Sequence, residues 1–132
     1  MQKNGVKDTK ETMKYEFTIG LVPITKKNHQ KIIWQHGRPL IVQSDKYRQY
    51  ERDAAAFVPP LGITGRVNVK AVFYMPTKRR VDLVNLLEAL CDVLVRWGAI
   101  EDDSAKYIVS MDGSRVEYDK ENPRTEVEIT EL

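Results

Sequence analysis

The chain has 132 residues, a net charge of +2 at neutral pH and one cysteine. This length fits one domain, and a single cysteine excludes an internal disulfide, which is consistent with a reducing compartment. No apolar run approaches the ~18 residues that a membrane span needs, and the first residues lack an apolar signal core. We therefore expect a cytoplasmic protein with no membrane partner.

Charge is unevenly distributed along the chain. Residues 1–80 contain 16 Lys and Arg against 6 Asp and Glu, whereas residues 81–132 contain 5 against 13. A basic half indicates a polyanionic partner. The alternative is that the charges only solvate the surface, because folding brings the two halves together.

Apolar periodicity and turn residues predict the elements of the first half. The polar residues 1–13 are expected to form a flexible N-terminal tail, and residues 14–132 a single domain. A strand over 14–23 precedes a β-hairpin over 31–43, whose turn contains "HGRP". A helix over about 45–57 follows, with a predicted buried stripe of Tyr47, Tyr50, Ala54 and Phe57.

The second half is predicted to begin with a strand over 66–75. A helix over about 83–97 comes next, and Gly98 is placed to end it. Its core-facing stripe consists of Leu83, Leu86, Leu87, Leu90, Leu94 and Trp97. Strands at 106–112 and 124–132 complete the order β-ββ-α-β-α-ββ, an α+β fold with one small mixed sheet and two main helices.

Acidic residues stand at both ends of the long helix. Asp82 precedes its first turn, where local pattern favours an N-cap that accepts the amide of residue 85. Asp92 and Arg96 are spaced for an ordinary surface ion pair. The segment "EDDS" at 101–104 is typical of a turn, but its adjacent carboxylates repel one another, and a divalent cation would offset that repulsion. Mg²⁺ prefers such oxygen ligands.

The stretch "RVDLVNLLEALCDVLVRWGAIEDDSAKY" resembles the RusA-type Holliday junction resolvases. The family pattern is Asp-x-Asp-Asn, a Lys three residues on, an Asp, a Gly and an Asp-Asp pair. Six positions match it in order, and they are Asp82, Asn85, Asp92, Gly98, Asp102 and Asp103. The segments "PITKKNHQ" and "GRPLIVQSDKYRQYERDA" match more weakly, as a basic loop, a hairpin and a helix.

This resemblance implies a homodimeric, Mg²⁺-dependent endonuclease, with Mn²⁺ as the alternative ion. Its substrate would be branched DNA, which it nicks at four-way junctions during homologous recombination and DNA repair. By position, Asp82 and Asp103 correspond to metal-binding catalytic aspartates, and Asp102 adjoins them. Asn85 would orient a ligand or the entry to the helix. The family is common in prophages, which makes a phage-derived role plausible.

Two positions depart from the family pattern. The second aspartate is Val84 here, and the lysine is Glu88. Because positions 84 and 88 are neighbours on one helix face, Glu88 is a candidate metal ligand that replaces the missing aspartate. The alternative is that Glu88 is a solvated residue and the protein is a weak or inactive junction-binding module of the same fold.

Basic residues beside these acids are candidate DNA contacts. Lys78, Arg79 and Arg80 immediately precede the acidic helix, and Lys26, Lys27 and Lys31 occupy another segment. Such side chains neutralise phosphates without reading sequence. Trp34, near the hairpin turn, is expected to pack, with base stacking as the alternative. An interaction protein with merely solvating charges is the third interpretation, and it predicts no salt-dependent DNA binding.

Overall fold

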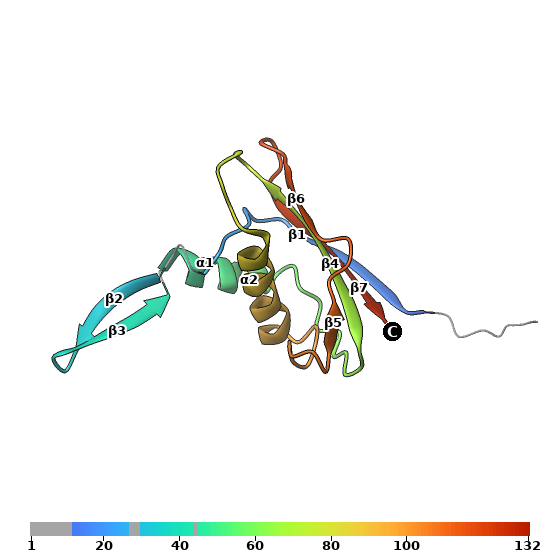
Figure 1. Cartoon of the computed structure of the whole chain (residues 1–132), viewed down its shortest axis with the longest axis horizontal. Coiled ribbons are helices and arrows are strands. Elements are labelled where there is room, and N and C mark those ends of the chain that lie inside the picture. Colours follow the sequence, from blue (N-terminus) through green and yellow to red (C-terminus); the bar gives the residue numbers. More distant parts are fainter. Residues whose placement is uncertain (1–11, 27–29, 44) are drawn as a thin grey trace, which may run out of the picture.

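The computed structural model describes residues 12–26, 30–43 and 45–132. In these ranges the chain forms an α+β fold, as predicted (Figure 1). Its elements are β1 (Lys14–Ile19), β2 (Gln30–Gln35), β3 (Arg38–Gln43), α1 (Asp45–Ala54), β4 (Val67–Met75), α2 (Leu83–Arg96), β5 (Ile108–Ser110), β6 (Arg115–Tyr118) and β7 (Arg124–Glu131). Most of the predicted tail, residues 1–11, lies outside the described residues, but the Met13 carbonyl already accepts the Glu131 amide at 2.9 Å.

The main sheet is mixed and has the strand order β1-β7-β4-β5, with β6 also paired to β4. β7 is antiparallel to both β1 and β4, whereas β5 and β6 run parallel to β4 along its other edge. The Asn68 side chain fixes the join between these two short strands, because its oxygen accepts from the Ser110 hydroxyl at 2.6 Å and the Asp112 amide at 2.8 Å. The sequence prediction missed β6, since this four-residue strand has a largely exposed face.

One face of the sheet is covered by α2. Alternate β4 residues from Val67 to Phe73 are buried there, as the period of two in a half-buried strand requires. The buried side chains of α2 are Leu86, Ala89, Leu90, Cys91, Val93 and Leu94. The predicted stripe is confirmed at Leu86, Leu90 and Leu94, whereas Leu83, Leu87 and Trp97 are only half-buried. The Trp97 indole donates to the Glu51 carbonyl of α1 at 2.8 Å. Gly98 ends α2 with φ +84°, as predicted.

α1 is shorter than predicted. Tyr47, Tyr50 and Ala54 are buried as expected, but Phe57 is exposed. After Ala54 the backbone tightens into a turn, in which the Phe57 amide bonds to the Ala54 carbonyl at 2.9 Å. The helical period therefore stops before Phe57, and Val58 takes the buried position instead.

The β2–β3 hairpin forms its own two-stranded sheet and projects away from the main body (Figure 1). His36 and Gly37 both have positive φ, 54° and 75°, which is the two-residue type I′ turn that suits a tight hairpin. Trp34 is 72% exposed, so the expectation that it packs is wrong. No helix within the described ranges is long and apolar enough to cross a membrane.

Candidate active site

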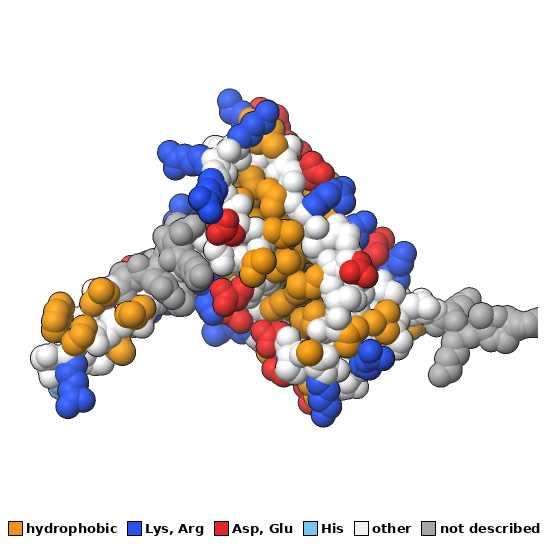
Figure 2. Space-filling model, viewed as in Figure 1, with side chains coloured by type: hydrophobic (Ala, Val, Ile, Leu, Met, Phe, Trp, Pro, Cys, Tyr) orange, Lys and Arg blue, Asp and Glu red, His pale blue; other side chains and the backbone are white. Residues whose placement is uncertain are grey.

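Acidic side chains lie along one edge of the region that α2 occupies, beside apolar side chains (Figure 2). Glu88 is exposed, and Asn85 and Asp92 are half-buried beside it. Val84 shares this exposed face and is 74% exposed. The amphipathic period of the helix explains the arrangement, since Leu86, Leu90 and Leu94 occupy its buried face.

Asp82 stands at the N-terminal end of this row. It occupies the N-cap position, with φ −94° and ψ 126°, but its side chain makes no cap hydrogen bond. The predicted capping role is therefore wrong, and the Asn85 amide bonds to the Asp82 backbone carbonyl instead, at 3.1 Å. The Asp82 carboxylate accepts from the Asn85 side-chain nitrogen at 3.4 Å and lies 3.7 Å from the Arg80 guanidinium, and 56% of the side chain is exposed.

Asp102 and Asp103 follow the C-terminal end of α2. The segment after Gly98 bonds to Gly62 and Ile63. Asp102 has the turn role expected from local pattern, because hydrogen bonds from Ser104, followed by one from the Asp103 amide, lower the pKa of its carboxyl group. The Asp103 side chain is exposed.

The Cys91 thiol is buried in α2 beside acidic residues. Burial raises the pKa of Cys91 to about 12, and the charges of Asp103, Asp92 and Glu88 add to the shift in that order. The Asp103 carboxylate is therefore within electrostatic reach of Cys91. The thiol stays protonated at neutral pH, which agrees with the packing role expected of a buried cysteine.

Two of these carboxylates have no bonded partner among the residues that the structure describes. Within the described part of the chain, Glu88 and Asp103 form neither a hydrogen bond nor an ion pair through their side chains. Exposed carboxylate oxygens of this kind suit a hard cation such as Mg²⁺. However, no three His, Cys, Asp or Glu residues in the described ranges lie close enough together to hold a metal ion. Additional ligands would have to come from water, from a DNA phosphate or from movement of these side chains.

Asp92 pairs with a residue distant in the sequence. Its carboxylate bonds to the Lys26 ammonium, and this hydrogen bond raises the pKa of Lys26. The predicted pair of Asp92 with Arg96 is therefore wrong, and Arg96 instead lies 3.6 Å from Glu51 and over the Trp97 ring.

The Lys26 contact also bears on the predicted DNA-binding lysines. Because the Lys26 ammonium is already bonded to Asp92, Lys26 is less available to phosphate than a free lysine. Lys27 lies outside the described residues. The backbone of Lys31 belongs to β2, opposite Val42, whereas its side chain is not described.

We expect Asp92→Asn to lower the free energy of unfolding by about 1 kcal/mol at neutral pH, since it removes a partly sheltered charged hydrogen bond. A raised lysine pKa means that the pair stabilises the fold below the ordinary lysine range and is lost as pH rises above about 10. Urea unfolding at neutral and alkaline pH should show a smaller alkaline loss in the variant. Arg96→Gln, which leaves the Lys26 contact intact, is the control, and an equal alkaline loss in wild type and Asp92→Asn would contradict the prediction.

The loop between β4 and α2 supplies the cationic side chains of the candidate site. Lys78, Arg79 and Arg80 are all exposed. The Lys78 ammonium lies over the Tyr118 ring, 5.2 Å from its centroid, and Arg80 is 91% exposed at the side chain beside Asp82. The structure therefore brings this predicted cationic segment next to the acidic row.

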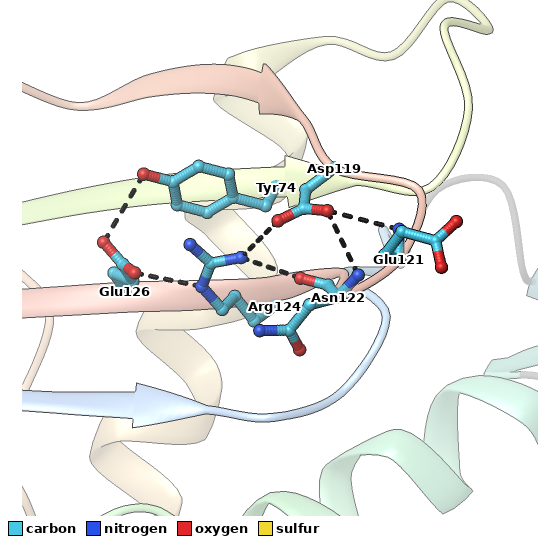
Figure 3. Close-up of polar contacts among 6 residues, drawn as sticks. All are labelled: Tyr74, Asp119, Glu121, Asn122, Arg124 and Glu126. Atoms are coloured by element: carbon cyan, nitrogen blue, oxygen red, sulfur yellow. Dashed lines mark hydrogen bonds and ion pairs between the residues drawn. The ribbon is translucent and has the colours of Figure 1, made fainter.

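Polar side chains around Arg124, here called the Arg124 cluster, connect the end of β4 with the start of β7 (Figure 3). Its members are Tyr74, Asp119, Glu121, Asn122, Arg124 and Glu126. Arg124 donates to Asp119 and Glu126 at 2.9 Å each, and its guanidinium lies 3.8 Å from the centroid of the Tyr74 ring. The Arg124 guanidinium lowers the pKa of the Asp119 carboxyl group. Since the Asp119 amide bonds to the Met75 carbonyl at 2.9 Å, the cluster holds the end of β4 where the basic loop departs. No local pattern in the sequence predicts this cluster.

Fold and site together define a small α+β domain that presents exposed carboxylates beside a cationic loop, an arrangement typical of proteins that act on a nucleic-acid backbone. The chain belongs to the family described as Endodeoxyribonuclease RusA, whose sequence profile matches residues 20–130. It is also 34% identical, over 64 residues, to the crossover junction endodeoxyribonuclease rusA of Enterobacteria phage HK97. That alignment covers 46% of this chain and 53% of the phage protein, so it spans about half the length of the relative.

Proposed function

We propose that the protein is a Mg²⁺-dependent endonuclease that nicks four-way DNA junctions in homologous recombination and DNA repair, with Mn²⁺ as an alternative ion. Family membership supports this activity. The observation that carries it is the exposed Asp82 carboxylate at the start of α2, 3.7 Å from the Arg80 guanidinium in the cationic loop at Lys78–Arg80, with the exposed Glu88 on the same helix.

Each residue of the site has a proposed role. Asp82, Asp103 and Glu88 would hold the ion, with Asp102 beside them. A bound ion would supply an activated water and stabilise the leaving oxygen at phosphorus. Asn85 orients the Asp82 carboxylate through its side-chain nitrogen, and Lys78, Arg79 and Arg80 bind the flanking phosphates.

We propose that the active form is a homodimer bound to branched DNA. Resolving a four-way junction requires two nicks in strands of like polarity, and each chain offers one acidic row and one basic loop. A pair of chains related by a two-fold axis would present two such sites to the two strands.

A non-catalytic junction-binding module is the second candidate. The observation that favours it is the exposure of Val84 at the position of a family aspartate, next to Glu88 at the position of the family lysine. Val84 and Glu88 alter the surface where the metal would bind. The basic loop that would hold DNA keeps its three exposed cations, Lys78, Arg79 and Arg80.

The two candidates are separated by assaying wild-type protein on a synthetic four-way junction and on a linear duplex of the same sequence. We expect Mg²⁺-dependent nicking of the junction and little nicking of the duplex. Without metal, gel-shift binding should weaken steeply with salt, as roughly six phosphate contacts would require. Salt-dependent binding with no nicking in Mg²⁺ or Mn²⁺ would favour the binding module, and binding that ignores salt would contradict both.

A further inference from the structure

We propose that a groove between the basic loop and β6 binds an unstacked nucleotide at the branch point of DNA, with its base stacked on the Tyr118 ring. The inference rests on the proposed function for the identity of the substrate. It adds a contact with a base to the phosphate contacts proposed for Lys78, Arg79 and Arg80.

The groove lies where the basic loop leaves β4 and has a volume of about 420 Å³. Lys78, Arg79 and Arg80 line one side, and Val116, Glu117 and Tyr118 of β6 line the other. Figure 2 shows Lys and Arg side chains gathered at this end of the molecule. Three cations and an aromatic ring therefore line one groove, which is the combination that binds single-stranded nucleic acid.

The charge of the groove suits a phosphate. Its acidic lining residue, Glu117, is already paired, because the Arg115 guanidinium donates to its carboxylate at 2.6 Å. The three exposed cations of the loop thus leave an excess of positive charge, which phosphates neutralise. A phosphate bound here would lie next to the candidate metal site, since Arg80 is 3.7 Å from Asp82.

Tyr118 gives the groove an aromatic surface. Its side chain is 47% exposed, and the Lys78 ammonium lies 5.2 Å from the centroid of its ring. The backbone that carries the ring is fixed, because Tyr118 pairs with Met75 of β4 and the next amide, of Asp119, bonds to the Met75 carbonyl at 2.9 Å. A fixed and exposed ring can stack on any base, since every base has a π-face.

A nucleotide of this kind is available at a branch point and not within a duplex. Inside a duplex both faces of a base are covered by its neighbours, and taking the base out of the stack costs free energy. That cost is least where base pairing is already interrupted. Phosphates are present in both kinds of DNA, so Tyr118 is the residue of the groove that would favour a junction over a linear duplex.

Photochemical crosslinking tests the contact directly. A four-way junction that carries 5-iodouracil at the branch point is irradiated with the full chain in the absence of metal, because this base crosslinks to an aromatic side chain stacked on it. We expect a crosslink at Tyr118, mapped by mass spectrometry, which Tyr118→Phe retains and Tyr118→Leu loses. In gel-shift assays, Tyr118→Leu should weaken junction binding at least about tenfold and duplex binding less than about twofold.

Phe57→Leu is the matched control, because Phe57 is also an exposed aromatic residue, at 37%, but lies outside the groove. Its binding to the junction should equal that of wild type. Arg79→Gln should weaken binding to junction and duplex to the same extent, since it removes a phosphate contact. Melting curves of the variants should match wild type, which separates loss of a contact from loss of the fold.

The inference is overturned if Tyr118→Leu binds junction and duplex as wild type does. Equal weakening of both would also overturn it, by limiting the ring to support of Lys78, as would a crosslink at other residues alone. Failure of the proposed function is a different result. It would appear as a wild type that prefers junctions and crosslinks at Tyr118 but nicks no DNA in Mg²⁺ or Mn²⁺.

Discussion

Asp103→Asn is expected to reduce Mg²⁺-dependent junction nicking by at least about 100-fold, the usual cost of removing one group that stabilises transition-state charge, while junction affinity changes less than about twofold. The substitution keeps the size of the side chain but removes a charge from a carboxylate that no described residue engages. Since the position is exposed, stability should change by less than about 0.5 kcal/mol. Single-turnover nicking and gel-shift binding measure the two effects separately.

The matched control for this prediction is Asp112→Asn. Asp112 is also an exposed aspartate, but it lies in the turn before β6 and is held through its backbone by Asn68. It should nick junctions at the wild-type rate. Equal activity of Asp103→Asn and Asp112→Asn would remove Asp103 from the proposed site.

Glu88→Ala completes this series by testing the replacement of the family aspartate. If Glu88 supplies a ligand from the face it shares with Val84, its loss should slow nicking at least about tenfold and raise the Mg²⁺ concentration needed for half-maximal rate. Nicking equal to wild type would show that Glu88 is only a solvated helix residue.

Leu90→Ala is expected to lower the free energy of unfolding by about 3 kcal/mol, measured by urea denaturation. Leu90 is 1% exposed in the layer between α2 and the sheet, so truncation removes buried apolar surface and leaves a cavity. Because α2 also carries Asn85 and Glu88 on its opposite side, loosening its packing should also lower the temperature at which nicking is lost.

Val84→Ala on the same helix is the control for the core substitution. The Val84 side chain is largely exposed, and alanine has the higher helix propensity. The free energy of unfolding should therefore stay within about 0.5 kcal/mol of wild type. A loss in Val84→Ala comparable to that in Leu90→Ala would mean that the described packing of α2 is not the one that stabilises the fold.

The elements with a strong local period were predictable from the sequence. The apolar repeat at Leu86, Leu90 and Leu94 and the glycine at position 98 placed α2 within one residue of its observed end. β6 was not predictable, because a short exposed strand depends on pairing with β4 and carries little period of its own. Trp34 was misjudged because a local pattern does not show whether a hairpin lies on the core or stands away from it.

The candidate site also combines residues that the sequence identified with a contact that it did not. Family resemblance, and not spacing, selected Asp82 and Asp103, and local pattern alone favoured a cap for Asp82 that the structure lacks. The partner of Asp92 was missed because Lys26 lies 66 positions away, and only tertiary packing brings the two together. Ion pairs between distant elements leave no periodic signal in a sequence.

The Arg124 cluster has a consequence for salt titrations of DNA binding. Its guanidinium is sheltered, with 18% of the side chain exposed, and sheltered pairs are screened far less than exposed ones. Added salt should therefore weaken the contacts of Lys78, Arg79 and Arg80 with phosphates at concentrations that leave the Arg124 ion pairs intact. The slope of DNA affinity against salt concentration would then report the number of phosphate contacts, because the strands around Arg124 remain folded.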